Sequence, residues 1–508
     1  MDFEQAAASE GDAGARPLSP VVAGALVFFT AAAVLVLEIL AARLLAPYVG
    51  VTLETWTGII GVVLAGIALG TWLGGRAADA LEPRRLLGPL LAAGGSLALL
   101  SVPAITLVGP AVAGGGAAAI VTLATIGFFA PAAVLSAVAP TVVKLQLADL
   151  RVTGSVVGRL SALGTAGAIA GTFATGFVLL AAFPTRPVVL GVGIGLVLAG
   201  LGLWLAVGQR RDVGAIGLAL ALAATATGAT VVLPPTCDDE SAYYCVRIEP
   251  DPFRPSGRTL WLDSLRHSYV DLADPTHLEF EYTQAFAAII DSQMGPGRPL
   301  RVLHVGGGGF TMPRYTRATR PGSYSRVLEL DARLVEIVRA DLALAIGEDL
   351  EVRTGDARLT LAAEPDDAYD LVVGDAFGGL AVPWHLTTVE FVGEVERVLR
   401  PGGLYVLNVI DYPPLDFARA ELATLGTAFA NAAVVGWAGP VHGLGGGNVV
   451  LVASDETFDL AAMAAGLRER GAGMRLFGDA ATLAALSTGA RVLTDDHAPV
   501  DQLLSRPR

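Results

Sequence analysis

Four acidic side chains at the ends of predicted β-strands are the strongest candidates for chemistry. The stretches RVLELD, LEVRTGDAR and YDLVVGDAF run from apolar residues into Glu329 with Asp331, into Asp356 and into Asp375. In an open parallel sheet, ligands bind beyond the carboxyl ends of the strands. Carboxylates there can accept hydrogen bonds from a nucleoside or take a proton from a substrate. We therefore expect one ligand site at this edge.

A glycine turn precedes these acids. The stretch RVLHVGGGG ends in Gly306, Gly307, Gly308 and Gly309. Glycine allows positive φ and lets the backbone come close to a ligand. About twenty residues further on, Glu329 is placed to accept hydrogen bonds from the two hydroxyls of a ribose. Asp356, with Ala357 beside it, is the predicted contact of an adenine amino group.

The elements that must position these residues alternate between strand and helix from about residue 291 to the end. Such alternation implies a parallel sheet covered on both faces, a Rossmann-like α/β domain over 291–508. Residues 236–290 alternate apolar and polar side chains and predict a small β-hairpin or sheet with a leading helix. Before these, residues 21–235 are too poor in charge for a water-soluble domain.

The membrane prediction for 21–235 rests on composition. The whole chain of 508 residues is 53% hydrophobic and 16% charged, and its net charge of -14 gives no footprint for nucleic acid. A bilayer core takes about 20 apolar residues per helix. Seven segments satisfy that length, which predicts a multi-pass helical membrane domain in contact with the lipid bilayer, after a disordered tail over 1–20. The segments are 21–45, 56–75, 86–109, 113–143, 157–182, 187–207 and 213–233.

Basic residues predict the orientation of this domain, because Lys and Arg concentrate in cytoplasmic loops. Seven crossings from a cytoplasmic N-terminus place the C-terminal domain outside the cytoplasm. The basic residues of three alternate loops fit this arrangement: Arg76, Arg84, Arg85, Lys144, Arg151, Arg159, Arg210 and Arg211.

The two cysteines of the chain, Cys237 and Cys245, are eight residues apart. An isolated pair closing a short loop is typical of an oxidising compartment and predicts a disulfide, with two unrelated thiols as the alternative. Two thiols without nearby histidines supply half of a tetrahedral zinc shell, so we expect no metal site.

Glu38 is an acid within an otherwise apolar predicted helix. Such a residue costs a few kcal/mol unless it faces a partner or a water-filled cavity. Pairing with Arg43 and a role in the passage of substrate or protons are equally weighted hypotheses.

Several stretches resemble the spermidine synthases, aminopropyltransferases related to class I methyltransferases. The whole chain resembles the bacterial membrane-fused spermidine-synthase-like proteins. VGGGGFTMPR, VLELD, TGDAR and YDLVVGDAF match motifs of that family, and DAFGGLAVPWHLTTVEF and LTDDHAPVDQL are similar to the membrane-fused branch. LWLDSLRH and EFEYTQ stand where the family has LDGxxQ and EFxYHE.

The resemblance implies roles for individual residues. Asp375 takes the place of the catalytic aspartate and Tyr282 that of a retained tyrosine, so both are catalytic candidates. His267 replaces the glutamine and is a candidate cofactor contact, while Thr283 replaces a histidine. Thr283, Tyr282 and His385 are the candidate substrate contacts, with a structural role at a lid as the alternative for His385.

Two departures from the family pattern concern acids that hold cationic amines. Gly309 occupies the position of an aspartate at the amine end of the cofactor. Gly378 occupies that of an aspartate that grips the far amine of putrescine. Both losses weaken the expectation of a diamine acceptor and of the decarboxylated cofactor.

The resemblance implies transfer of an aminopropyl group from decarboxylated S-adenosylmethionine to a polyamine or other amine, releasing methylthioadenosine. Alternatives are an S-adenosylmethionine-dependent methyltransferase and a non-catalytic protein that binds or transports polyamines. Soluble relatives associate, so a homodimer is an expected assembly. His304, in a predicted strand, is expected to be a core residue, and His497 a residue of a C-terminal turn over the sheet.

Overall fold

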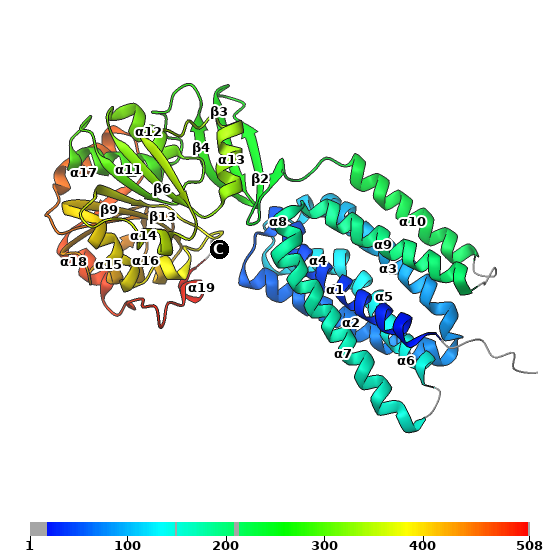
Figure 1. The fold of residues 1–508 in the computed structure, drawn as a ribbon. Coiled ribbons are helices and arrows are strands. Elements are labelled where there is room, and N and C mark those ends of the chain that lie inside the picture. The colour runs from blue at the N-terminus through cyan, green and yellow to red at the C-terminus, as the bar shows by residue number, and fades with distance from the viewer. Residues whose placement is uncertain (1–17, 148–149, 208–212, 506–508) are drawn as a thin grey trace, which may run out of the picture. The chain divides into compact units, whose positions relative to one another are not determined.

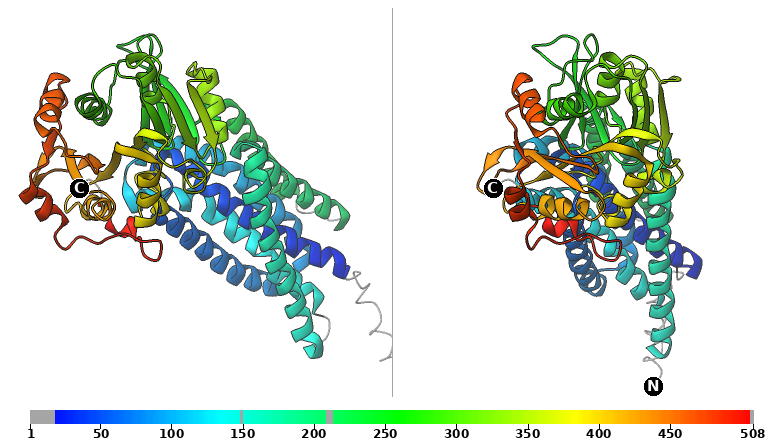
Figure 2. Two further views of the ribbon diagram at one scale, coloured as in Figure 1. Left: turned by 60° about the vertical axis from the view of Figure 1, so that its left-hand side comes forward. Right: turned by 90° about the vertical axis from the view of Figure 1, so that its left-hand side faces the viewer.

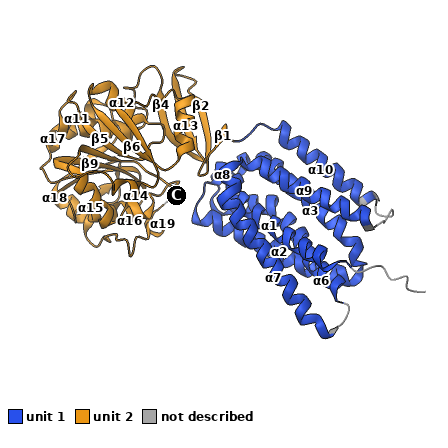
Figure 3. Ribbon diagram, in the orientation of Figure 1, with its two compact units in different colours: residues 1–236 blue, residues 237–508 orange. Residues whose placement is uncertain are grey.

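The computed structural model describes residues 18–147, 150–207 and 213–505. The chain divides into two compact units, Met1–Thr236 and Cys237–Arg508 (Figure 3). Most of the predicted N-terminal tail lies outside the described residues, as do Arg210 and Arg211, and the first helix begins at Pro20.

Within the described residues, the N-terminal unit has six helical spans long and apolar enough to cross a membrane. The seventh predicted segment corresponds to α10 (Val213–Val232), whose described apolar part, Ile216–Val232, is shorter. The unit is therefore a multi-pass membrane domain by length and composition, and its orientation stays a prediction. The spans are α1 (Pro20–Val49), α2 (Leu53–Ala80), α3 (Pro83–Val112), α4 to α6 (Gly116–Gln146), α7 to α8 (Thr153–Ala182) and α9 (Thr185–Val207).

The fourth span is interrupted twice, near its two internal prolines. It consists of α4 (Gly116–Ala124), a π-helical turn (Thr125–Phe129), α5 (Ala130–Ser136) and α6 (Val138–Gln146). A proline removes the amide donor for the carbonyl four residues earlier. For Pro131 that carbonyl lies within the π-helical turn, and for Pro140 it belongs to the last residue of α5. These interruptions explain why the predicted segment is longer than one span needs.

Helices α1 and α7 lie side by side because α7 presents glycine to its neighbour (Figures 1 and 2). A Cβ on Gly167 would lie 2.1 Å from the Phe28 carbonyl oxygen, and one on Gly171 would lie 2.6 Å from that of Ala32. Close backbone approach of this kind supports helix association in lipid. Gly176 takes no part in this approach, because a Cβ there would have no described atom within 4 Å.

The C-terminal unit opens with an antiparallel sheet in the order β1-β2-β3-β4. Cys237 and Cys245 are joined by a disulfide, which closes the loop in front of β2. The sheet packs against α13 through Val246, Leu260 and Leu334. Its strands are β1 (Asp239–Glu240), β2 (Cys245–Pro250), β3 (Gly257–Leu262) and β4 (Leu265–Asp271).

The main sheet has the strand order β14-β10-β13-β9-β8-β5-β6-β7. Strands β9, β8, β5, β6 and β7 are parallel, as predicted, while β13, β10 and β14 are antiparallel additions from the C-terminal third. The chain leaves β5 towards β6 and later returns on its other side as β8, so the order reverses between β5 and β8. The strands are β5 (Arg301–Val305), β6 (Tyr324–Glu329), β7 (Leu350–Thr354), β8 (Tyr369–Gly374), β9 (Leu399–Asp411), β10 (Asn431–Gly436), β13 (Gly447–Ser454) and β14 (Arg475–Phe477).

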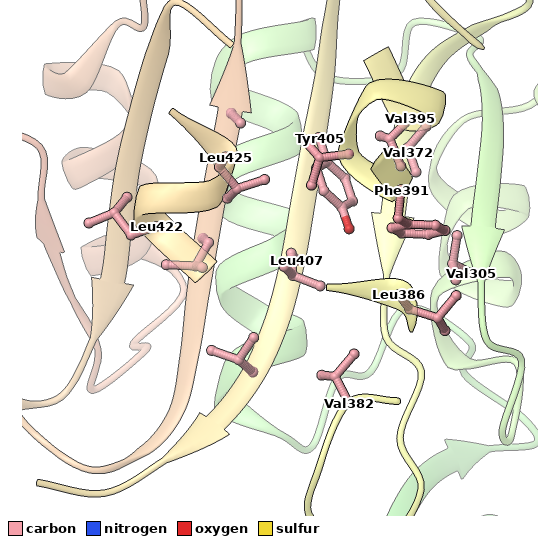
Figure 4. Packing of buried hydrophobic residues seen from close by; sticks show 14 of the residues in the cluster. Val305, Val372, Val382, Leu386, Phe391, Val395, Tyr405, Leu407, Leu422 and Leu425 are labelled. Carbon is pink, nitrogen blue, oxygen red and sulfur yellow. The ribbon is translucent and has the colours of Figure 1, made fainter. Parts of the chain in front are cut away.

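Helices cover both faces of this sheet (Figure 1). Leu303 and Tyr405 face a cluster with α15 and α16, whereas their neighbours Val302 and Leu404 face a cluster with α11 and α17. Figure 4 shows Phe391 of α15 packed near Tyr405 and Val305. Burial on both faces explains the near-continuous apolar strands in the sequence. The helices are α11 (Glu281–Met294), α12 (Thr311–Thr319), α13 (Ala332–Asp341), α14 (Ala357–Leu361), α15 (Val389–Val398), α16 (Asp416–Leu425), α17 (Leu460–Glu469), α18 (Ala480–Ser487) and α19 (Val500–Leu503).

Candidate active site

A cavity of about 620 Å³ lies beyond the carboxyl ends of β5, β6 and β8. We call it the first pocket. Strand-order reversals between parallel strands create such crevices. Most of the predicted cofactor residues line it, together with apolar side chains that suit a planar ring. The lining of the first pocket includes Tyr244, His267, Gly306, Gly307, Gly308, Glu329, Leu330, Asp356, Ala357, Asp375, His385 and Leu386.

The glycine turn and Glu329 form one hydrogen-bonded unit. The Gly307 and Gly308 amides donate to Glu329 Oε2 at 2.8 and 3.3 Å, and the Asp331 amide donates to Oε1 at 2.9 Å. Burial raises the pKa of Glu329, and these backbone donors oppose that shift. Oε2 accepts from two amides and Oε1 from one, so Oε1 keeps a lone pair with which Glu329 can still accept from a ligand hydroxyl.

Asp356 and His385 form a second pair at the wall of the first pocket. His385 Nε2 lies 3.3 Å from Asp356 Oδ2, while Asp356 Oδ1 accepts the Arg358 amide at the start of α14. Arg358 in turn donates to the His385 carbonyl oxygen. His385, predicted as a substrate contact, thus lines the first pocket beside the predicted adenine contact.

A second cavity, of about 590 Å³, meets the first at Asp375. We call it the second pocket. Its lining shares His267, Asp375 and Phe377 with the first pocket. A group held between the two cavities would thus be in reach of Asp375. The remaining lining residues are Leu265, Arg266, Phe280, Tyr282, Gly379, Asn408, Ile410 and Asn448.

Asp375 is held by two side-chain donors. The Tyr282 hydroxyl donates to its Oδ2 and the Asn408 amide to its Oδ1, both at 3.0 Å. The Asn448 amide donates in turn to Asn408 Oδ1 at 3.0 Å, which fixes the orientation of that amide. Both carboxylate oxygens are therefore oriented before any ligand is present.

Burial raises the pKa of Asp375 to about 6, against the opposing hydrogen bonds from Asn408 and Tyr282. The same burial, with the nearby carboxylate, raises the pKa of Tyr282 well above its ordinary range, so Tyr282 stays a donor. A carboxylate with a pKa near neutrality suits general-base chemistry. It is ionised at pH 7 but takes up a proton readily.

Two side chains of the small sheet region complete the junction of the pockets. Burial lowers the pKa of His267 to about 4, so this imidazole is neutral near pH 7 and can accept as well as donate. The Tyr244 hydroxyl donates to the Phe377 carbonyl oxygen at 3.0 Å and ties the small sheet to the loop after β8.

Four other predicted residues do not reach either pocket. Thr283, predicted as a substrate contact, lines neither pocket, and its hydroxyl donates to the Phe280 carbonyl oxygen in the first turn of α11. Asp331, a candidate cofactor contact, instead caps α13 through the Arg333 and Leu334 amides and lines neither pocket. His304 is buried beside the Ser325 hydroxyl, which confirms a core role. His497 belongs to a C-terminal turn and contacts Arg491.

Four further residues at the two pockets were not predicted from the sequence: Asn408, Asn448, Arg266 and Tyr244. A sequence signal for Asn408 was available, because it is a polar residue within the apolar strand stretch LYVLNVID. The other three depend on which strands pair and which way their side chains point, and no local pattern marks them.

No family model matches the chain. A polyamine aminopropyltransferase of Vibrio vulnificus is 32% identical over 113 residues, 22% of this chain and 38% of that protein. One of Chromobacterium violaceum is 26% identical over 142 residues, 28% of this chain and 53% of that protein. The matches thus span between about a third and about half of these relatives. The structure of a probable spermidine synthase from Corynebacterium glutamicum is 30% identical over 54% of this chain and all of that one, with a TM-score of 0.48.

The C-terminal unit contains a spermidine synthase-like domain. This spermidine synthase-like domain carries both pockets, and the long apolar helices precede it. The spermidine synthase of Thermotoga maritima aligns over 53% of this chain and 83% of its own at 15% identity, with a TM-score of 0.35. The matches to the two polyamine aminopropyltransferases confirm, for this part of the chain, the resemblance stated from the sequence motifs.

Proposed function

We propose that the protein is a membrane-integrated aminopropyltransferase. It transfers an aminopropyl group from decarboxylated S-adenosylmethionine to an amine acceptor. The observation that carries this proposal is the position of Asp375, which lies where two cavities meet and is held by Tyr282 and Asn408. The Vibrio vulnificus and Chromobacterium violaceum relatives are aminopropyltransferases by description, which supports the same reaction class.

The first pocket fits an adenosyl group. A Cβ on Gly306 would lie 2.4 Å from the Asp375 carbonyl oxygen, so this turn leaves no room for a side chain. Glu329 offers the free lone pair of Oε1 to a ribose hydroxyl, and Asp356 is an acceptor for an adenine amino group. Leu330 and Leu386 add apolar surface for the ring.

Decarboxylated S-adenosylmethionine supplies, when bound, an aminopropyl carbon activated by a sulfonium. The chain must provide an unprotonated amine in line with that carbon and a place for the proton. Asp375 accepts the amine proton. The hydrogen bond from Tyr282 keeps the Asp375 carboxylate directed at the junction of the pockets. Orientation and proton acceptance together account for large rate factors in such displacements. Because His267 is neutral near pH 7, it does not repel the cationic sulfonium of the ligand.

The test is product formation by the full-length protein in detergent. Decarboxylated S-adenosylmethionine and a panel of amines should give methylthioadenosine and a product heavier by one aminopropyl group. Asp375→Asn keeps the side-chain shape and should reduce turnover about 100- to 10,000-fold, the usual range for loss of a general base.

Three outcomes would overturn the proposal. S-adenosylhomocysteine formed from S-adenosylmethionine would make the protein a methyltransferase. Equal turnover by Asp375→Asn and the unmodified protein would remove the proton acceptor. Binding of polyamines, with no binding of any adenosyl compound, would leave a receptor or transport partner instead of an enzyme.

A further inference from the structure

We propose that the second pocket accepts an amine whose far end carries a carboxylate, rather than a diamine. This inference rests on the proposed function, because it names the class of acceptor for the same site. The transferred group and the role of Asp375 stay as described above. What it adds is the charge that the far end of the acceptor must carry.

Among the residues that the structure describes, the charged groups lining the second pocket are one acid and one base. Asp375 is the acid, at the junction with the first pocket, and Arg266 is the base. His267 is neutral near pH 7 because burial lowers its pKa. Asn408 and Asn448 add amide dipoles without charge. A diamine would bring a second cation into a pocket whose one lining acid is already engaged with the reacting amine.

Arg266 is arranged to receive an anion. Its guanidinium stacks on the Phe280 ring at 4.9 Å, and Phe280 also lines the pocket. Stacking on a ring face leaves the N–H edge of the guanidinium for a planar partner, and a carboxylate matches that fork with two parallel hydrogen bonds.

The existing contact of Arg266 leaves this edge available. Arg266 Nη2 lies 3.7 Å from Glu279 Oε1, beyond hydrogen-bond distance, and the side chains are 45% and 38% exposed. Exposed pairs of this kind contribute little. Glu279 does not line either pocket, so it supplies no second acid to the acceptor.

The reaction balances with such an acceptor. The acceptor nitrogen forms a bond to the aminopropyl carbon, and the carbon–sulfur bond breaks with its electron pair going to sulfur. The products are methylthioadenosine, an N-aminopropyl amino acid and a proton taken by Asp375. The far carboxylate stays ionised throughout and makes no covalent change.

The experiment compares acceptors of matched length that differ at one end. Putrescine, 4-aminobutyrate and butylamine, and their five-carbon counterparts, are offered to the full-length protein in detergent. Amine binding is measured by calorimetry with methylthioadenosine present, and methylthioadenosine release is measured in parallel. We expect the amino acids to bind at least about tenfold more tightly than the diamines, the scale of a charge-assisted hydrogen bond.

Charge reversal at Arg266 provides the second arm. Arg266→Glu should lose the preference for amino acids and gain affinity for the diamines. The matched control is Arg247→Glu, because Arg247 also lies in the small sheet and stacks on an aromatic ring, Trp261, at 5.0 Å, but lines neither pocket. The control should keep the preference of the unmodified protein.

The outcomes separate the two proposals. Tighter binding and faster turnover of diamines would overturn the carboxylate inference and leave the aminopropyltransferase intact. Selective binding of amino acids without methylthioadenosine release would overturn the transferase and keep the acceptor class. An unchanged preference in Arg266→Glu would overturn the role of this side chain.

Discussion

At the scale of single residues, Asp375 combines a raised pKa with fixed geometry. Its carboxylate lies where the two pockets meet, and its two donors come from Tyr282 in α11 and Asn408 in β9. Burial raises its pKa to about 6, and both donors lower it. The ionised fraction of the proposed base at neutral pH therefore depends on these two neighbours.

This balance predicts the pH dependence of turnover. The proposed base works in its ionised form. On the acid limb of the profile, kcat/KM should therefore rise with pH up to about 6, the pKa of Asp375, and level off above it. Tyr282→Phe and Asn408→Leu each remove a donor that favours the carboxylate, so the acid limb should move to higher pH. Profiles recorded between pH 5 and about 8 check this. An acid limb that stays in place in both variants would mean that Asp375 is not the titrating group.

The same pKa predicts a pH-dependent stability difference. The pKa of Asp375 in the folded protein lies above its ordinary value of 3.8, so the folded state binds the proton more tightly than the unfolded state. Asp375 therefore costs stability progressively as pH rises from its ordinary pKa to the raised value. Asp375→Asn does not titrate. Its thermal midpoint should exceed that of the unmodified protein above pH 6 and approach it near pH 4, whereas a constant difference would contradict the shift.

Part of this site could be predicted from the sequence, and the reason is geometric. Carboxyl ends of parallel strands meet at one edge, so Glu329, Asp356 and Asp375 were placed together by strand order alone. Asn448 comes from the antiparallel strand β13, whose pairing with β9 sets Asn448 opposite Ile410. Arg266 pairs with Trp261 next to a register shift between β3 and β4, and this shift sets the direction of its side chain. Neither relationship is encoded in a local pattern.

At the scale of elements, the glycine turn is packed against β4. The Gly309 amide donates to the Ser268 hydroxyl, and a Cβ on Gly309 would lie 2.8 Å from Ser268 Cβ. The aspartate that the family pattern has here would need the two segments to move apart. The loss of that acid is thus coupled to a tighter approach of the small sheet.

This approach predicts different outcomes at the two glycines that replace family acids. Gly309→Ala should destabilise the protein by about 1 to 3 kcal/mol through overpacking. Gly378→Ala should change stability by less than about 0.5 kcal/mol, since its Cβ would meet nothing nearer than the Ala381 oxygen at 4.0 Å. Thermal unfolding in detergent measures both, and equal effects would contradict the packing argument.

A C-terminal turn braces the helix that carries Asp356. Asp495 accepts from Arg358 Nη2 at 2.6 Å and from the Thr388 hydroxyl at 2.7 Å. Arg358 also donates to the His385 carbonyl, so one acid outside the pocket supports two residues of its wall.

Loss of this brace should weaken nucleoside binding more than catalysis. Asp495→Ala is expected to raise the Kd of methylthioadenosine about fivefold or more, the effect of losing about 1 kcal/mol of hydrogen bonding, with kcat nearly unchanged. The neighbouring, exposed Asp496 serves as control, because Asp496→Ala leaves both hydrogen bonds in place. Titration calorimetry distinguishes the variants. Equal Kd values for Asp495→Ala and Asp496→Ala would mean that Asp495 does not support nucleoside binding.

At the scale of the whole molecule, the side of the membrane depends on one helix. The six long spans return the chain to the side on which it started, and α10 decides whether it crosses once more. The shorter apolar stretch of α10 is why the predicted seventh crossing is less strongly supported than the other six. The positive charges of the loops and the disulfide both favour an exported C-terminal unit.

Reporter fusions test that crossing directly. Alkaline phosphatase, which folds in an oxidising compartment, should be active when fused after residue 508 and inactive when fused after Val207. Green fluorescent protein should give the opposite pattern. Activity on the same side at both points would mean that α10 does not span the bilayer, and the prediction of an outward-facing domain would then be wrong.

The contacts of Glu329 with the glycine turn have one more consequence. Its two oxygens accept from three backbone amides, so the turn around Gly307 is held by hydrogen bonds before a ligand binds. A nucleoside that binds there has no loop to order and so avoids that entropic cost. The heat capacity change of binding should then report only the apolar surface that leaves water. In thermodynamic terms, the site is pre-organised for its ligand and does not need to close around it.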